Sequence, residues 1–131
     1  MNLLIVYGTT EGQTRKIAEL TANRIRERGH QAKLLDSTAL ESDLNLATYD
    51  AFIIAASVHQ ECHQEEITNF VIAHRETLGT KPSTFISVSL SAVLEGAEPE
   101  AQRYVDHFVS VTGWRPRRTL LLGGALRLTE S

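Results

Sequence analysis

The sequence predicts an α/β domain of the doubly wound class, in which helices cover both faces of a parallel sheet. Five short apolar stretches alternate with helical patterns along the 131 residues, and this alternation is typical of parallel strands joined by crossover helices. The first strand is apolar without a break from Leu3 to Tyr7, as in strands that are buried on both faces. Glycine and proline stand at the ends of the patterns. A single domain over residues 1–131 is therefore expected.

The first half of the chain is expected to hold three strands and one long helix. The helix runs from about Gln13 to Arg28, and Gly29 supplies its C-terminal stop. Its inward-facing residues at helical spacing are expected to be Ile17, Leu20 and Ile25. The strands are expected at Asn2–Tyr7, Gln31–Asp36 and Asp50–Ser57, with a short helix somewhere between Ser37 and Thr48.

The second half is expected to hold two helices, each followed by a strand. One helix, from about Gln64 to Leu78, carries an apolar stripe at helical spacing. The stripe comprises Ile67, Phe70, Val71, His74 and Leu78. Pro99 fits the first turn of the next helix, because acids flank it and suit the positive helix end. The buried residues of that helix are expected to be Ala101, Tyr104, Val105 and Phe108, and the strands are expected at Ser83–Leu90 and Thr119–Ala125.

Composition and charge exclude several classes of protein. The formal net charge is -3, so no basic field favours nucleic acid. The apolar runs are too short to span a bilayer, and the N-terminus lacks the basic start and cleavage site of a signal peptide. A single cysteine, Cys62, excludes an intrachain disulfide and fits a reducing cytoplasm. Because its spacing from the histidines matches no zinc motif, no metal is expected.

The loop GTTEGQT between the first strand and the first helix is the best candidate for a ligand site. A loop that leads into a helix N-terminus presents unpaired N–H groups and a partial positive charge, which together suit a phosphate. Thr9, Thr10 and Thr14 add hydroxyl donors, while Gly8 and Gly12 allow the backbone to approach a ligand closely. A plain strand-to-helix turn with threonine caps remains the alternative.

Spacing excludes other ligand loops that follow a strand. GTTEGQT is one residue shorter than a Walker A loop and has Gln13 in place of its lysine. The dinucleotide-binding motif G-x-G-x-x-G is absent because Gly8 and Gly12 are four residues apart. Receiver domains share the topology but need acids where this chain has Tyr7 and Ser57. The G-x-S-x-G elbow of hydrolases is also missing.

The stretch IVYGTTEGQTRKIA resembles the phosphate-binding signature of flavodoxins. The aromatic residue, the hydroxyl at Thr9, the small residue at Gly12, Thr14 and Ala18 all have the family's spacing. One departure is Thr21, where the family has an aliphatic residue; this puts local helix packing in doubt rather than phosphate binding. The resemblance implies FMN as the cofactor and a five-stranded parallel sheet with the strand order 2-1-3-4-5.

Longer stretches resemble the menaquinone-dependent protoporphyrinogen IX dehydrogenases, which are flavodoxin-like FMN enzymes of haem biosynthesis. The matching blocks are Gly12–Ala18, Ala56–Val58, Phe85–Val88, Trp114–Pro116 and Gly124–Arg127. They occur in order along essentially the whole chain. The resemblance implies oxidation of protoporphyrinogen IX to protoporphyrin IX, with electrons passing through FMN to a quinone in the membrane. Because the flavin carries this chemistry, no side chain is assigned a catalytic role.

The same resemblance implies which residues contact the cofactor and the porphyrinogen. Those assigned to the phosphate are Thr9, Thr10, Glu11, Gly12, Gln13 and Thr14. Those assigned to the two edges of the flavin ring are Ser57, Val58 and His59 on one side and Ser87, Val88, Ser89, Leu90 and Ser91 on the other. His63 and Arg127 are candidates for substrate contact. The alternatives are that His59 and His63 are simply exposed loop residues, and that Arg127 pairs with the chain's own carboxylates.

The end of the sequence departs from the family, because the helix that usually follows the fifth strand is not expected within ALRLTES. Either the sequence is a truncated product, or another element covers this face of the sheet. In the second case we expect a homodimer or other assembly to bury the surface around Leu120, Leu122 and the first helix. The turn from Trp114 to Arg118 is interpreted as an aromatic anchor with a solvated basic surface, or else as a contact with anionic lipid. A cytoplasmic protein, peripheral on the inner membrane, would fit the quinone acceptor.

A second function, from a different class, stays open on the sequence alone. The chain could be a flavodoxin-type electron carrier, or a non-catalytic module that keeps the fold after the chemistry is gone. Carriers of this kind tend to be strongly acidic around the flavin, whereas this chain is only mildly acidic overall. That difference slightly favours the enzyme.

Overall fold

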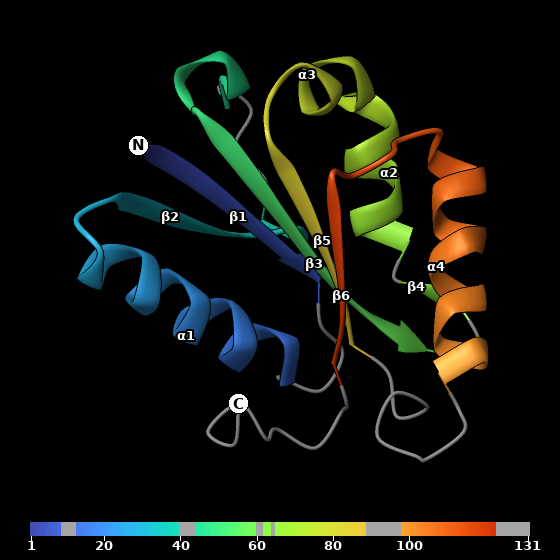
Figure 1. The fold of residues 1–131 in the computed structure, drawn as a ribbon. Coiled ribbons are helices and arrows are strands. Elements are labelled where there is room, and N and C mark those ends of the chain that lie inside the picture. Colours follow the sequence, from blue (N-terminus) through green and yellow to red (C-terminus); the bar gives the residue numbers. More distant parts are fainter. Residues whose placement is uncertain (9–12, 40–43, 60–61, 64, 89–97, 123–131) are drawn as a thin grey trace.

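The computed structural model describes residues 1–8, 13–39, 44–59, 62–63, 65–88 and 98–122. A twisted sheet lies at the centre, with helices on both of its faces (Figure 1). The strands are β1 (Asn2–Gly8), β2 (Gln31–Asp36), β3 (Ala51–His59), β4 (Cys62–His63), β5 (Ser83–Val88) and β6 (Arg118–Leu122). The helices are α1 (Gln13–Glu27), α2 (Glu65–Ala73), α3 (Arg75–Thr80) and α4 (Glu98–Thr112), with a 3₁₀ turn, η1 (Leu46–Thr48).

The five long strands are parallel and lie in the order β2-β1-β3-β5-β6. Because β4 is a short strand outside this series, the order is the predicted 2-1-3-4-5. From β1 the chain passes first to β2 on one side, and later to β3, β5 and β6 on the other. The strand order therefore reverses between β1 and β3, where sheets of this class form a crevice beyond the carboxyl ends of their strands.

Alternate residues of the strands feed two separate cores. On one face, α1 packs over a cluster that includes Ile5, Ala55 and Ile86 together with its own Ile17 and Ala22. On the other face, α2 and α4 cover a larger core (Figure 1). Burial on both faces explains why the predicted strands lack the polar alternation of a half-exposed sheet.

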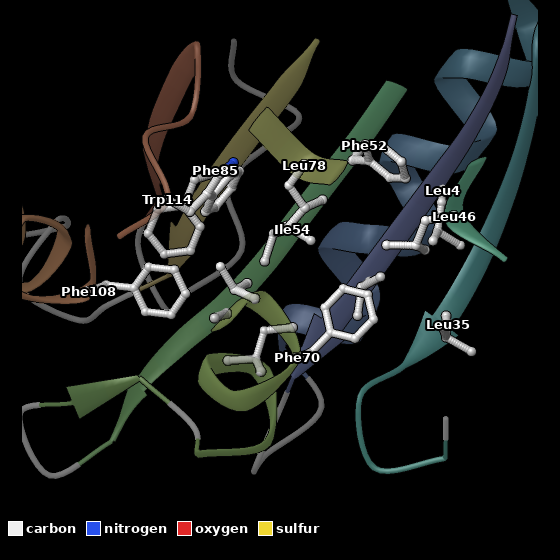
Figure 2. Packing of buried hydrophobic residues seen from close by; sticks show 14 of the residues in the cluster. Leu4, Leu35, Leu46, Phe52, Ile54, Phe70, Leu78, Phe85, Phe108 and Trp114 are labelled. Atoms are coloured by element: carbon white, nitrogen blue, oxygen red, sulfur yellow. The ribbon is translucent and has the colours of Figure 1, made fainter. Parts of the chain in front are cut away.

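Three aromatic residues, from β5, α4 and the turn before β6, form an aromatic anchor in the larger core (Figure 2). The rings of Phe85 and Phe108 stack with centroids 4.5 Å apart. The Trp114 ring lies edge-on to both, and its Nε1 donates a hydrogen bond to Ser83 Oγ at 3.2 Å. Only 1% of Trp114 is exposed, so the interpretation of this residue as a structural anchor is confirmed.

The predicted helix over residues 64–78 is wrong as a single element. The structure shows α2 and α3 with a break at His74, whose φ and ψ of -116° and 19° are not helical. The His74 ring instead lies against Phe70, with centroids 4.6 Å apart. His74 is only half-buried, so its prediction as part of the buried stripe is also wrong, whereas Ile67 and Leu78 are buried as expected.

The inward face of α1 differs at one position from the prediction. Leu20 is 41% exposed, because α1 turns Ala18 and Ala22 toward the sheet. Thr21, the departure from the flavodoxin pattern, is half-buried, and its Oγ1 donates to the Ile17 carbonyl at 2.8 Å. The hydroxyl is thus satisfied within the helix, and the local packing accommodates the threonine.

Two glycines with positive φ allow a matched test of backbone strain. Gly29 (φ 87°) has open space around a built Cβ, whereas a Cβ on Gly113 (φ 73°) would lie 2.9 Å from Arg75 Nη1. That nitrogen also donates to the Thr112 carbonyl at the end of α4. We expect Gly29→Ala to cost about 1 kcal/mol, and Gly113→Ala to cost more because Arg75 must move as well. Urea unfolding of the two variants measures the difference, and equal losses would contradict a role for Arg75.

Candidate cofactor site

The carboxyl ends of β1, β3 and β5 meet at one edge of the sheet. Gly8, the last residue of β1, is in register with Ala56 of β3, and the next residue of β3, Ser57, is in register with Val88 of β5. Helix α1 begins at Gln13, so its N-terminus lies at this same edge (Figure 1). The first four N–H groups of a helix have no partner within the helix. This edge therefore offers backbone donors and a partial positive charge to an anion.

Thr14, the second residue of α1, carries the most informative side chain at this edge. It is 0% exposed, and its Oγ1 has no hydrogen-bond partner in the described structure. A buried hydroxyl without a partner costs about 1–3 kcal/mol, so proteins seldom leave one in that state. A ligand oxygen at the helix N-terminus would satisfy it. The prediction that Thr14 belongs to an anion site therefore has a physical basis beyond the motif.

Ser37 is a second buried hydroxyl at this edge, and no sequence motif pointed to it. It follows the end of β2, where its N–H donates to the Tyr7 carbonyl at 2.9 Å. Its side chain is 4% exposed, and its Oγ also has no partner among the described residues. The only sequence signal is a polar residue directly after a strand. That position is common, and burial there depends on tertiary packing.

The residues predicted for the two edges of the flavin ring lie on neighbouring strands. Ser57 of β3 is half-buried, and Ser87 of β5 is 2% exposed. Both already have interactions within the protein. Val88 is in register with Ser57 and is buried. The sheet thus brings the end of β3 next to the end of β5, as the predicted site requires.

The alternative that His59 and His63 are loop residues is wrong, because both lie on strands. β3 continues past Ser57 to His59 and pairs antiparallel with β4, so that Val58 is opposite His63 and His59 is opposite Cys62. A two-residue strand has no apolar pattern that sequence reasoning could detect. Cys62 is therefore part of the short hairpin that β3 and β4 form.

Several predicted site residues lie outside the described residues. They are Thr9, Thr10, Glu11 and Gly12 of the phosphate loop, Ser89, Leu90 and Ser91 after β5, and Arg127. Gln13 begins α1 at the expected place. The roles of the residues outside the described ranges, and that of Gln13, stay predictions.

Two further observations concern metal ligands and membrane spans. Within the described ranges, no three His, Cys, Asp or Glu side chains gather as a metal site would require. In the same ranges, none of the helices has the length and the apolar run needed to cross a bilayer.

His74 provides a test of pH dependence away from this edge. Partial burial between α2 and α3 lowers its pKa below the ordinary value of 6.5. The unfolded chain therefore binds more protons than the folded one below pH 6.5, so stability should fall as the pH drops through that range. We expect urea midpoints to decrease from pH 7.5 to pH 5, and to decrease less in His74→Gln. An identical pH dependence in both proteins would contradict this.

Comparison with known proteins agrees with this geometry. The family model described as "Flavodoxin domain" matches residues 4–130. The chain belongs to the flavodoxin-domain family. The flavodoxin of Streptococcus pneumoniae has a TM-score of 0.74 at 18% identity, covering 99% of this chain and 90% of that one. A flavodoxin mutant from Pseudomonas aeruginosa has a TM-score of 0.71 at 17% identity, covering 99% and 89%. These likenesses show the flavodoxin-like fold.

Within this family, the chain has relatives with one particular activity in their names. It is 34% identical over 128 residues to protoporphyrinogen IX dehydrogenase [quinone] of Escherichia coli K12, covering 97% of this chain and 70% of that protein. The protein of the same name from Leishmania major is 28% identical over 127 residues, covering 94% and 54%. The resemblance found in the sequence blocks is therefore confirmed for this flavodoxin domain.

Proposed function

We propose that this flavodoxin domain binds FMN and oxidises protoporphyrinogen IX to protoporphyrin IX, with a quinone as the electron acceptor. The support is the 34% identity to the Escherichia coli enzyme along 97% of the chain. The N-terminus of α1, at the carboxyl ends of the strands, also suits a phosphate. On this proposal the protein acts in the cytoplasm, in peripheral contact with the membrane that holds the quinone.

The buried, unpartnered Oγ1 of Thr14 is the observation that carries the cofactor proposal. A phosphate oxygen is a strong, charged acceptor, and hydrogen bonds to charged groups are worth about 1.5–3 kcal/mol. The hydroxyl lies on the second residue of α1, where the helix also presents its own free N–H groups. The residue types present thus fit the phosphate of FMN.

Each part of the edge has a distinct task in this proposal. Thr14 and the N-terminus of α1 hold the phosphate and so fix the position of the whole cofactor. The ends of β3 and β5, with Ser57 and Ser87, border the space beside them. When bound, FMN supplies the redox chemistry. His63 lies on β4 in the hairpin that borders this edge, and we propose it, with Arg127, for substrate contact.

One sequence of measurements separates the enzyme from the alternatives. The purified protein is first tested for flavin absorbance, with and without added FMN. It is then mixed with protoporphyrinogen IX and a quinone, and the fluorescence of the porphyrin is followed. Bound flavin with quinone-dependent porphyrin formation is the expected result. Bound flavin without that activity would indicate an electron carrier, and failure to bind FMN would leave only the interaction module.

A further inference from the structure

Strand β6 is one of the two outer strands of the described sheet, and three of its five residues are leucine. Among the described residues it pairs only with β5. Its sequence, RTLLL, has no proline or lysine, and its central Leu120 is 45% exposed. An outer strand presents a row of unpaired backbone groups, and natural proteins usually protect such a row with charges, proline or a covering element. Only Arg118 supplies a charge here.

A groove of about 800 Å³ lies alongside this strand and α4. Asp106 and Ser110 of α4 line one side of it, and Arg115 and Thr119 line the other. Thr119 thus faces the α4 side of the sheet, whereas Leu122 packs with the core on the α1 side. Because side chains alternate along a strand, Leu120 lies on the α1 side with Leu122.

We propose that a second copy of this chain pairs with β6 in antiparallel orientation and joins the two sheets into one. A two-fold axis at Leu120 would place Arg118 opposite Leu122 of the partner subunit. Residues directly opposite each other in an antiparallel pair have Cβ atoms about 4.5–5.5 Å apart. The two exposed Leu120 side chains would therefore contact each other on the α1 side. This contact is self-complementary, as a two-fold interface requires.

The distribution of charge favours a second copy and its antiparallel orientation. Arg115, Arg117 and Arg118 are exposed at the start of β6, with no acid between Ser110 and Leu122. At the opposite end of the strand, α4 begins with Glu98 and Glu100, and the one cation that follows, Arg103, is matched by Asp106 in the middle of the helix. An antiparallel pair brings the basic end of each subunit to the acidic end of the other. A parallel pair would bring like charges together, which disfavours it.

The sequence predicted an assembly over the sheet face around Leu120, Leu122 and the first helix. The proposal places the contact at β6 and not at the first helix. Leu20 on α1 is also exposed, at 41%, but it lies beside Leu34 of β2, near the other outer strand of the sheet. The two leucines have the same chemistry and nearly the same exposure, but Leu120 lies on an outer strand itself, whereas Leu20 lies on a helix. They form a matched pair for a test.

The test measures molecular mass by sedimentation for the wild type, Leu120→Lys and Leu20→Lys. We expect the wild type and Leu20→Lys to be dimers, and the dimer dissociation constant of Leu120→Lys to rise about tenfold or more. Circular dichroism checks that each variant is folded. We also expect the wild-type dimer to weaken as salt is raised, because ions screen the attraction between the basic end of one subunit and the acidic end of the other.

A second measurement does not depend on the charged variant folding. In a Cys62→Ser background, Leu120→Cys should be joined into a covalent dimer by a short thiol crosslinker, and Leu20→Cys should not. A monomeric wild type at micromolar concentration would overturn the proposal. A Leu120→Lys protein that stays as dimeric as Leu20→Lys, or crosslinking that is equal at both positions, would overturn it as well.

Discussion

Replacing Thr14 with valine is expected to weaken FMN binding about 10- to 100-fold and, at the same time, to stabilise the flavin-free protein. The loss of affinity follows because a charge-assisted hydrogen bond to the phosphate disappears, at about 1.5–3 kcal/mol. Titration of the flavin-free protein with FMN, followed by flavin fluorescence, measures it. Valine keeps the shape and the β-branching of threonine, so the helix itself is little affected.

The gain in stability follows from the buried hydroxyl. Without a ligand, Thr14 Oγ1 has no partner among the described residues, and valine removes that unsatisfied group without leaving a cavity. We expect the free energy of unfolding of the flavin-free protein to rise by about 1 kcal/mol. The two effects have opposite signs, which a general packing defect could not produce. A variant that both unfolds more easily and binds FMN as well as the wild type would contradict the assignment.

Thr112 provides the matched control. It is also a buried threonine, 0% exposed, but its Oγ1 donates to the Phe108 carbonyl at 2.8 Å and accepts from the Trp114 N–H at 3.2 Å. Thr112→Val should therefore lower the free energy of unfolding by about 1–3 kcal/mol. This residue ends α4, at the opposite end of the sheet from the candidate cofactor site. FMN affinity should therefore not change once the protein is folded.

Truncating Trp114 to alanine is expected to lower the free energy of unfolding by about 3–5 kcal/mol. The indole is 1% exposed and lies edge-on to the stacked Phe85 and Phe108 rings (Figure 2). Its removal leaves a cavity and also takes away the donor to Ser83 Oγ, which is itself buried. Domains of this size are stable by only about 5–15 kcal/mol. Urea unfolding should therefore show a large shift in the midpoint.

Arg115, the next residue along the chain, is the control for this change. It is exposed, so Arg115→Ala should alter the free energy of unfolding by no more than about 0.5 kcal/mol. Trp114→Phe should be intermediate, because it keeps an aromatic ring but loses the N–H. If Trp114→Ala were as stable as Arg115→Ala, the aromatic anchor would not hold the turn before β6 onto the core.

The fold was predictable wherever local chemistry decides the structure. Helix α1 ends within one residue of the expected place, because Gly29 with its positive φ of 87° provides a strong stop signal. Tertiary packing decided the rest. No glycine or proline marks the break at His74, and nothing in the periodicity of α1 shows that Leu20 faces away from the sheet.

The candidate site was predictable to a similar extent. Thr14 could be identified because a glycine- and threonine-rich loop that leads into a helix N-terminus is a recognised signal for an anion. Ser37 could not, because its importance rests on burial beside the end of β1, which only the folded chain reveals. The hairpin of β3 and β4 was missed for a different reason. Its pairing spans four residues and has no sequence pattern of its own.

The most direct test of the central claim compares FMN with riboflavin, which differs from it only by the phosphate. The flavin-free protein is titrated with each, and flavin fluorescence gives both dissociation constants. If Thr14 and the N-terminus of α1 hold the phosphate, riboflavin should bind at least about 100-fold more weakly than FMN, since several charge-assisted hydrogen bonds are lost. Equal affinities, or no binding of FMN at all, would contradict the account.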